Sequence, residues 1–472
     1  MTWEVVIGLE THAQLSTASK IFSGAATAFG AAPNTQASAV DIALPGVLPV
    51  LNKGAVERAI RFGLAVGATI NTRSVFARKN YFYPDMPKAY QISQYDQPLN
   101  VDGYLDLPDG SRVGIERAHM EEDAGKSVHV GGSEGRVHGA EHTLIDLNRA
   151  GVPLVEIVSR PDISSPDQAR EYVSELRAIL LAIGASDAKM EEGSMRVDAN
   201  VSVRKPGDPL GTRCEIKNVN SVRSVGRAIE YEARRQIDLI EAGEKVQQQT
   251  RHWSEADGRT HTLRTKEDAD DYRYFLEPDL VPLDPSAEWI ESVRAALPPL
   301  PATRRAALAT AAGLAPDAEA IGLLVERGQD AYVLAVADAG GDLARAIVHV
   351  QQAFAEAGDS PAVPAADLAR LTGLEVDGKL TATQAKTVVG VLLERDGGDA
   401  EAIAAELGYE AVDSDELAGL VDAAIAAEPD AWAKFQAGEG KAMGALVGHV
   451  MKASKGQADG KLVTALLNSR KG

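Results

Sequence analysis

The stretch that decides the fold of this chain is Val5-Val6-Ile7-Gly8-Leu9-Glu10-Thr11-His12-Ala13-Gln14, close to its start. Its alternation of apolar and polar residues predicts a β-strand, in which successive side chains point to opposite faces. Ile7 and Leu9 therefore share one side, and Glu10 and His12 share the other. A carboxylate and an imidazole on one strand face can converge on a single Mg²⁺, Mn²⁺ or Zn²⁺ ion. A strand edge with a solvated polar face would show the same pattern.

The composition is that of a globular protein with several domains. The chain has 472 residues, 45% hydrophobic and 25% charged, and a chain of this length suggests about three domains. No apolar run approaches the roughly 20 residues of a membrane-spanning helix, and the first residues lack the basic region of a signal peptide. A single cysteine, Cys214, excludes disulfides within the chain and zinc sites built from cysteine pairs. We therefore expect a cytoplasmic protein.

Charge is distributed unevenly along the chain. The formal net charge of −20 would ordinarily argue against nucleic acid as a partner. From Lys434 to the end, however, seven basic residues stand against two acidic ones, which gives this segment a charge of +5. A solvated helical face would show such a bias. The alternative is an electrostatic contact with a polyanion.

Three long helices are predicted between the strands of the first 290 residues. Apolar positions at helical spacing predict a helix over 53–68. A serine cap followed by Pro166 opens a second helix, which extends to Ile183. A third covers about 222–242 and ends at Gly243.

The character of the sequence changes at two places. Around Pro298-Pro299-Leu300-Pro301, glycine-rich strands give way to alanine-rich helical sequence, and a second break falls at Asp396-Gly397-Gly398-Asp399. We predict an α+β protein whose strand-rich N-terminal domain, residues 1–295, precedes two all-α modules, residues 296–397 and 398–472.

Acidic side chains in two further segments need a partner. The run His119-Met120-Glu121-Glu122-Asp123 holds three adjacent carboxylates, which repel one another unless a cation or solvent screens them. At least one of them is expected to face an ion, with His119 nearby. Glu156 lies inside an otherwise apolar strand, where an unpaired charge is costly, so it needs a basic side chain or a metal.

A polar row is predicted on the strand from Met195 to Arg204. Its alternation places Arg196, Asp198 and Asn200 on one face, a combination of guanidinium, carboxylate and amide that suits phosphate and metal chemistry. A solvated sheet face would look similar. Residues 78–95 interleave aromatic residues with cations, among them Lys79, and we read them as a proline-restrained loop for stacking and phosphate contacts. An aromatic loop packed on a core is the alternative.

Taken together, these stretches resemble the B subunit of the glutamyl/aspartyl-tRNA amidotransferase, the GatB family. The likeness covers nearly the whole chain. Its motifs are Val6–Glu10 with His12, Leu44–Asn52, Arg78–Gln94, His119–Ser127, Asp146–Arg149 with Pro153-Leu154, Met190–Ser194 with Arg196 and Asp198–Asn200, Asp270–Phe275, and, in the tail, Gly440–Gly444, Leu446–Gly448 and Met451-Lys452.

The resemblance implies a cradle-like catalytic domain and an ATP-dependent ligase that works as a heterotrimer. This chain would phosphorylate the misacylated side chain of Glu-tRNA(Gln), Asp-tRNA(Asn) or both, using ATP and Mg²⁺. Ammonia for the amidation would come from glutamine through an amidase partner, the A subunit, and a small C subunit would complete the complex. We expect no glutamine hydrolysis in this chain, because it has no Ser-Ser-Lys amidase signature.

The resemblance also implies roles for individual residues. A catalytic pocket that binds the metal and the phosphates would use Glu10, His12, Glu122, Glu156 and Asp198. We expect Lys79, Arg196, Asn200 and Ser194 to bind the nucleotide, and Lys434, Lys441, Lys452 and Lys455 to bind tRNA.

The chain departs from some members of the family in its early loop. Those members bind zinc through two cysteine pairs, and the corresponding residues here are Ser23, Ala25, Ser38 and Asp41. Without thiolates we expect no structural zinc, so that packing must stabilise the loop.

Two other classes of protein would carry the same carboxylates. One is an RNA-binding scaffold in which they hold a structural ion, and the other is a free-standing metal-dependent phosphohydrolase. Cleavage of ATP that depends on aminoacyl-tRNA separates the three: the scaffold shows none, and the hydrolase does not need the charged tRNA.

Overall fold

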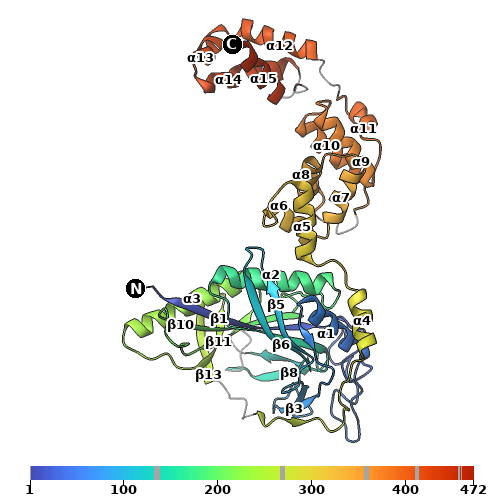
Figure 1. The fold of residues 1–472 in the computed structure, drawn as a ribbon, viewed down its shortest axis with the longest axis vertical. Helices are drawn as coiled ribbons and strands as arrows, with labels where there is room; N and C mark the ends of the chain where they lie inside the picture. The colour runs from blue at the N-terminus through green and yellow to red at the C-terminus, as the bar shows by residue number, and fades with distance from the viewer. Residues whose placement is uncertain are drawn as a thin grey trace. The chain divides into compact units, whose positions relative to one another are not determined.

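The computed structural model describes residues 2–131, 139–265, 272–355, 361–409, 414–454, 458 and 460–471. The chain divides into two compact units, Met1–Ala302 and Thr303–Gly472, which are described in turn. Figure 1 shows a strand-rich first unit and a helical second unit. This confirms the predicted fold class, while the limits of the three predicted domains stay predictions. Among the described residues, none of the helices is both long and apolar enough to cross a membrane.

The described part of the first unit is built on a twelve-stranded sheet. Its main path runs β13-β12-β11-β10-β1-β9-β6-β4-β3-β14, with β5 and β2 paired beside β6, and β7 and β8 forming a separate ribbon. The strands are β1 (Glu4–Gln14), β2 (Thr69–Ile70), β3 (Ala77–Asn80), β4 (Tyr90–Ser93), β5 (Asn100–Asp106), β6 (Arg112–Glu122), β7 (Lys126–Val130), β8 (His142–Asp146), β9 (Pro153–Ser159), β10 (Met195–Arg204), β11 (Cys214–Val219), β12 (Gln249–Ser254), β13 (Arg259–Thr265) and β14 (Phe275–Leu276).

β1 lies inside the sheet, between β10 and β9, and is antiparallel to both. Its burial alternates as predicted, with Ile7 and Leu9 in the core and Glu10 and His12 partly exposed. β10 alternates in the same way over most of its length. Together the two strands place a row of polar residues on the face of the sheet that points away from the core.

The described residues of the first unit include the α-helices α1 (Lys53–Ala65), α2 (Pro166–Ala182), α3 (Val222–Glu241) and α4 (Ala287–Ala295). Ser165 caps α2 by accepting a hydrogen bond from the backbone N–H of Gln168, as the serine-proline signal predicted. Buried residues of α1, α2 and α3 join the hydrophobic cluster that contains Ile7 and Leu9. These helices therefore cover one face of the sheet (Figure 1), and the opposite face is left for the polar residues of β1 and β10.

Residues 78–95, read from the sequence as a loop, are partly strand. β3 and β4 pair antiparallel, with Lys79 opposite Gln91, and a loop connects them. The prolines in the connecting residues hid the hairpin, because proline is depleted in strands.

The described residues of the second unit form two groups of helices, each with its own hydrophobic core. The first group comprises α5 (Pro301–Ala312), α6 (Glu319–Glu326), α7 (Asp330–Asp338), α8 (Leu343–Ala353), α9 (Ala365–Val376), α10 (Ala382–Glu394) and α11 (Ala400–Glu406). The second comprises α12 (Ser414–Ala427), α13 (Pro429–Gln436), the short helix η3 (Gly440–Ala442), α14 (Met443–Ala453) and α15 (Gly460–Lys471).

Candidate functional site

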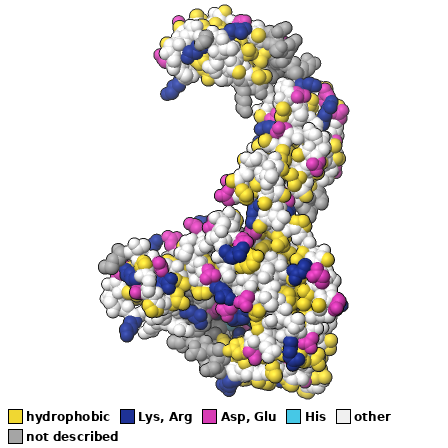
Figure 2. Space-filling model, in the orientation of Figure 1, with side chains coloured by type: hydrophobic (Ala, Val, Ile, Leu, Met, Phe, Trp, Pro, Cys, Tyr) yellow, Lys and Arg dark blue, Asp and Glu magenta, His cyan; other side chains and the backbone are white. Residues whose placement is uncertain are grey.

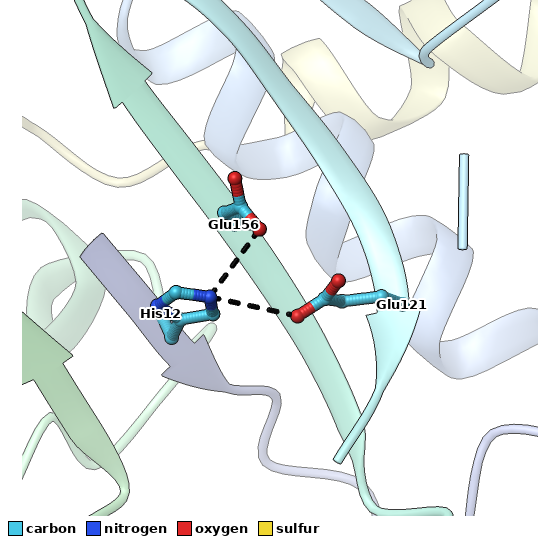
Figure 3. Close-up of side chains that lie close together, drawn as sticks. All are labelled: His12, Glu121 and Glu156. Atoms are coloured by element: carbon cyan, nitrogen blue, oxygen red, sulfur yellow. Dashed lines mark ion pairs between the residues drawn. The ribbon is translucent and has the colours of Figure 1, made fainter. Parts of the chain in front are cut away.

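Three acidic and imidazole side chains from β1, β6 and β9 converge on the polar face of the sheet (Figure 3). His12 lies opposite Glu156 in the β1–β9 register, and its Nε2 atom is 3.3 Å from Glu156 Oε2. The same Nε2 atom lies 3.7 Å from Glu121 Oε1. The potential ligand atoms of the three residues all lie within 4.8 Å of one another, which is close enough for a shared cation.

His119 completes this cluster from β6. It faces Glu156 across the β6–β9 register, and its Nε2 atom lies 3.7 Å from Glu156 Oε2 and 3.8 Å from Glu121 Oε2. Its buried Nδ1 atom has no hydrogen-bond partner among the described residues. Two imidazoles and two carboxylates therefore form one compact group, which we name the His12 cluster (His12, His119, Glu121 and Glu156).

Opposite charges in the His12 cluster stabilise the ionised forms of its side chains. Burial alone would lower the pKa of His12, but the hydrogen bond and charge of Glu156, together with Glu121 and Asp198, raise it to about 9. Burial opposes ionisation of Glu156, yet the charges of His119, His12 and Lys79 hold its pKa well below the usual range. Glu156, predicted to need a partner, is thus an ionised carboxylate between imidazoles.

The cluster lies in a pocket of about 300 Å³ that also holds cations and aromatic rings, and we name it the charged pocket. Glu10, Lys79, Arg117, Arg213 and Lys217 line it together with the cluster. Lys79 Nζ lies 4.6 Å from the centre of the Tyr272 ring. At the rim, Tyr95 and Tyr274 stack with their ring centres 4.1 Å apart. Acidic groups for a cation and basic groups for an anion therefore face the same space.

Glu10, Asp198 and Asn200 lie next to the cluster on β1 and β10. Asn200 Nδ2 donates a 2.8 Å hydrogen bond to Glu10 Oε1. Asp198, opposite Glu10 in the register, accepts a 2.7 Å hydrogen bond from Lys217 Nζ. The structure thus brings Glu10 and Asp198 to the same part of the sheet face as His12, although Asp198 is committed to an ion pair.

Glu122 faces away from the charged pocket. Its carboxylate accepts a 2.8 Å hydrogen bond from the backbone N–H of Ile92 and pairs with Lys88, and the residue is 2% exposed. Its neighbour Glu121 takes the place that the resemblance gave to Glu122. The reason is strand parity: His119 and Glu121, two residues apart on β6, share a face. Counting in steps of two from His119 would have identified Glu121 from the sequence.

Arg196 and Ser194 hold the backbone near the pocket and do not line it. Arg196 makes two hydrogen bonds to Asp123, of 3.0 and 3.1 Å. The hydroxyl of Ser194 accepts a 2.9 Å hydrogen bond from the backbone N–H of Lys189 and so closes the turn before β10. Both predicted nucleotide contacts are therefore engaged within the protein, whereas Lys79 is at the pocket and Asn200 is beside it.

The predicted tRNA-binding lysines belong to the last group of helices. Lys434 lies in the last turn of α13, Lys441 in η3 and Lys452 in the last turn of α14, and all three are exposed. Lys455 and the motif residues Asp270 and Asp271 lie outside the described residues. Figure 2 shows dark-blue basic side chains on the visible face of this group.

A buried ion pair stabilises the early loop. Lys20 is fully buried, and its Nζ atom lies 3.4 Å from Asp41 Oδ2 and 3.2 Å from the carbonyl oxygen of Leu147. Asp41 also accepts hydrogen bonds from the Ser23 hydroxyl and from the backbone N–H of Ser38. The backbone N–H of Ala25 donates a 3.3 Å hydrogen bond to the Ser23 hydroxyl, so all four positions compared with the cysteines of some members take part in one polar network.

The donors of the His12 cluster fit a divalent cation. Carboxylate oxygens suit Mg²⁺, and imidazole nitrogens extend the choice to Mn²⁺ and Zn²⁺. Such an ion would also offset the repulsion between Glu121 and Glu156. Phosphoryl transfer requires basic side chains and a metal-ion site around the same pocket.

Comparisons with known proteins identify the same family in both units of the chain. A family model described as the GatB/GatE catalytic domain matches residues 5–291, and one described as the GatB domain matches residues 334–470. The B subunit of the aspartyl/glutamyl-tRNA(Asn/Gln) amidotransferase from Frankia casuarinae is 50% identical, over all of this chain and 96% of that protein. The protein of the same name from Ralstonia nicotianae is 51% identical over the full length of both, and that from Nocardia farcinica is 48% identical over 98% and 95%.

Proposed function

Because this chain belongs to the GatB family, the B subunits of ATP-dependent tRNA amidotransferases, we propose that its charged pocket is where the misacylated side chain is phosphorylated and amidated. The observation that carries the proposal is the convergence of His12, Glu121 and Glu156 beside Lys79 in one pocket. Enzymes of this family are ligases of protein synthesis that act with other subunits and with tRNA.

The chemistry needs a cation site next to basic side chains. A carboxylate is a poor acyl donor, because its oxygen leaves with difficulty. Its oxygen therefore attacks the γ-phosphorus of ATP, ADP leaves, and an acyl phosphate forms. The nitrogen of ammonia then attacks the carbonyl carbon, inorganic phosphate leaves, and the nitrogen loses a proton to give the amide. Both steps concentrate negative charge that must be neutralised.

We assign binding of a Mg²⁺ ion to His12, Glu121 and Glu156, with His119 beside them and Glu10 and Asp198 adjacent. When bound, such an ion neutralises phosphate charge and orients the oxygens of ATP. Glu122 is not part of this proposal, because its carboxylate is paired with Lys88 behind the sheet. No zinc is proposed for the early loop, whose polar network already includes Ser23 and Asp41.

The remaining residues of the pocket would bind the anionic substrates. Lys79, Arg213 and Lys217 are positioned to attract the triphosphate and the side-chain carboxylate. Asn200 orients Glu10 through its hydrogen bond, and Arg196 and Ser194 act by fixing the backbone before β10. The proton lost by the attacking nitrogen would pass to a carboxylate of the pocket, since His12 is either protonated or bound to the ion.

We further propose that ammonia comes from a separate amidase chain, the A subunit, that a small C subunit completes the complex, and that the substrates are Glu-tRNA(Gln), Asp-tRNA(Asn) or both. The names of the relatives above specify these two tRNAs and a B subunit, which supports the substrates and the presence of other subunits. The exposed lysines of α13, η3 and α14 would contact the tRNA.

The test is ATP cleavage that depends on aminoacyl-tRNA, measured on the complete complex. Glu10→Ala, Asp198→Ala and Glu156→Gln are each expected to lower the rate by about 100-fold or more while tRNA retention stays unchanged. Binding of Mn²⁺, followed by its electron paramagnetic resonance signal, is expected to weaken in Glu156→Gln.

Glu57→Gln is the matched control, because Glu57 is a partly exposed glutamate on α1 that pairs with Arg61. It should retain wild-type turnover and Mn²⁺ binding. Wild-type turnover in all three pocket variants would overturn the assignment. Absence of ATP cleavage in the wild-type complex would favour a scaffold, and cleavage without charged tRNA would favour a phosphohydrolase.

A further inference from the structure

Asp123 is a buried carboxylate beside the charged pocket to which the proposed function gives no role. It directly follows β6 and is 3% exposed. Arg196 donates one hydrogen bond to each of its carboxylate oxygens, at 3.0 and 3.1 Å, and Gln14 Nε2 donates a third of 2.9 Å. Arg149 Nε lies 3.7 Å from Asp123 Oδ2. We name these four residues the Asp123 clamp (Gln14, Asp123, Arg149 and Arg196).

The clamp belongs to the strands that carry the proposed metal site. Gln14 lies two residues after His12 on the same face of β1, and Asp123 lies two residues after Glu121 at the end of β6. Arg196 is directly opposite His12 in the register of β1 and β10. The clamp and the His12 cluster are therefore neighbouring groups on one face of the sheet.

The backbone of Asp123 is fixed by the segment that leads into β9. Its N–H donates a 2.8 Å hydrogen bond to the carbonyl oxygen of Val152, and its own carbonyl oxygen accepts a 2.9 Å hydrogen bond from the N–H of Gly151. Because backbone and carboxylate are both bonded, Asp123 is a preorganised anchor for the side chains that contact it.

Arg196 is a cation that is able to compete with a metal ion for the carboxylates of the site. Burial opposes its charge, but Asp123, followed by Glu121 and Asp198, raises the pKa of Arg196. Three carboxylates thus attract one guanidinium, and its paired hydrogen bonds go to Asp123. A two-point contact of this kind fixes the plane of the guanidinium as well as its position.

We propose that Asp123 is a positioning residue that holds Arg196 away from Glu121, so that the Glu121 carboxylate stays available to a divalent cation. This inference rests on the proposed function, because the cation is the one assigned to the His12 cluster. Asp123 itself contacts neither the cation nor the substrates. Without its charge, Arg196 turns towards Glu121, and a guanidinium and a metal ion compete for the same oxygens.

The first test compares Asp123→Asn with Glu232→Gln as a matched control. Glu232 is also a buried carboxylate surrounded by two arginines and a glutamine. Arg235 Nε and Gln236 Nε2 each donate a 2.9 Å hydrogen bond to it, and Arg251 Nε lies 3.3 Å away. Glu232 is on the buried side of α3, which packs on the helix-covered face of the sheet and not on the face with the pocket.

Both substitutions weaken a buried ion pair, so both should lower the unfolding temperature. Mn²⁺ binding to the complete complex is measured by electron paramagnetic resonance below that temperature. It should weaken by about tenfold or more in Asp123→Asn and by less than about twofold in Glu232→Gln. Aminoacyl-tRNA-dependent turnover of Asp123→Asn should fall by about tenfold or more at limiting Mg²⁺ and recover as Mg²⁺ is raised, because the ion competes with Arg196.

The second test removes the competing guanidinium. In the double variant Asp123→Asn with Arg196→Gln, Mn²⁺ affinity should return to within about twofold of that of Arg196→Gln alone, since no cation is left to turn towards Glu121. A residue that only stabilised the fold would give a double variant that binds Mn²⁺ no better than Asp123→Asn.

Three results would overturn the inference while the proposed function stands: unchanged Mn²⁺ affinity in Asp123→Asn, equal weakening in Asp123→Asn and Glu232→Gln, or no recovery in the double variant. Failure of the proposed function is a different observation, since Glu156→Gln would then retain wild-type turnover and Mn²⁺ binding.

Discussion

At the level of single residues, adjacent glutamates on β6 have opposite surroundings. Glu121 faces His12 at 3.7 Å in the charged pocket. Glu122 points to the other side, where Lys88 and the backbone of Ile92 neutralise it in a buried position. Two glutamate side chains thus have different environments, and the direction in which each points decides whether it lies in the charged pocket or in a buried ion pair.

This arrangement predicts opposite phenotypes for the same substitution at neighbouring positions. Glu121→Gln should lower aminoacyl-tRNA-dependent ATP cleavage by about 100-fold or more, and it should cost less stability than Glu122→Gln, because Glu156 still pairs with His12 and His119. Glu122→Gln breaks a buried ion pair and should lower the free energy of unfolding by about 3 kcal/mol. Urea denaturation and steady-state turnover of both variants check this, and a stable, inactive Glu122→Gln would contradict the assignment.

At the level of elements, a buried ion pair between Lys20 and Asp41 holds the early loop. Lys20 and Asp41 are both buried, and burial lowers the pKa of Lys20 while Asp41 opposes that effect. Asp41 further accepts hydrogen bonds from both Ser23 and Ser38. Removing one partner would leave the other as an uncompensated charge in the interior.

Lys20→Met is therefore expected to destabilise the first unit by about 3–5 kcal/mol. A zinc chelator should leave the unfolding temperature of the wild type unchanged. Thermal unfolding with and without the chelator tests both statements, with Lys53→Met as a control at an exposed lysine. A fall in unfolding temperature on chelation would show that a metal contributes after all.

Elements with a strong local signal were predictable, and their pairing was not. The alternation of β1 and β10 and the serine cap of α2 follow from the nearest neighbours in sequence. The contact between His12 and Glu156 depends instead on β1 pairing with β9, about 145 residues later in the chain. No local pattern specifies that pairing, whereas the choice between Glu121 and Glu122 could have been made from the sequence, because Glu121 shares a strand face with His119. The β3–β4 hairpin was missed because its prolines suggested a loop.

At the level of the whole molecule, an acidic chain is proposed to bind a polyanion through one basic segment. The net charge is −20, yet the segment from Lys434 onwards carries +5. Lys434, Lys441 and Lys452 are exposed on the last group of helices. Local charge at the contact, rather than the sum over the chain, determines how many counterions tRNA releases on binding.

The affinity for tRNA should accordingly fall steeply as salt rises. Replacing Lys434, Lys441 or Lys452 by Gln should each reduce the slope of log K against log salt by about 0.7–0.9, with ATP cleavage at saturating tRNA unchanged. Filter binding at several salt concentrations measures this. Lys386→Gln, at an exposed lysine on α10, is the control. An affinity for tRNA that does not change with salt concentration would contradict a contact between tRNA and the segment from Lys434 onwards.

β1 carries core residues on one side and Glu10 and His12 on the other. A shift of one residue against β9 and β10 would exchange these sides along the entire strand. Such a misfolded chain would expose Ile7 and Leu9 and bury Glu10 and His12, and it would lose part of its core together with the His12 cluster. A single strand register therefore determines both the packing of the core and the geometry of the proposed site.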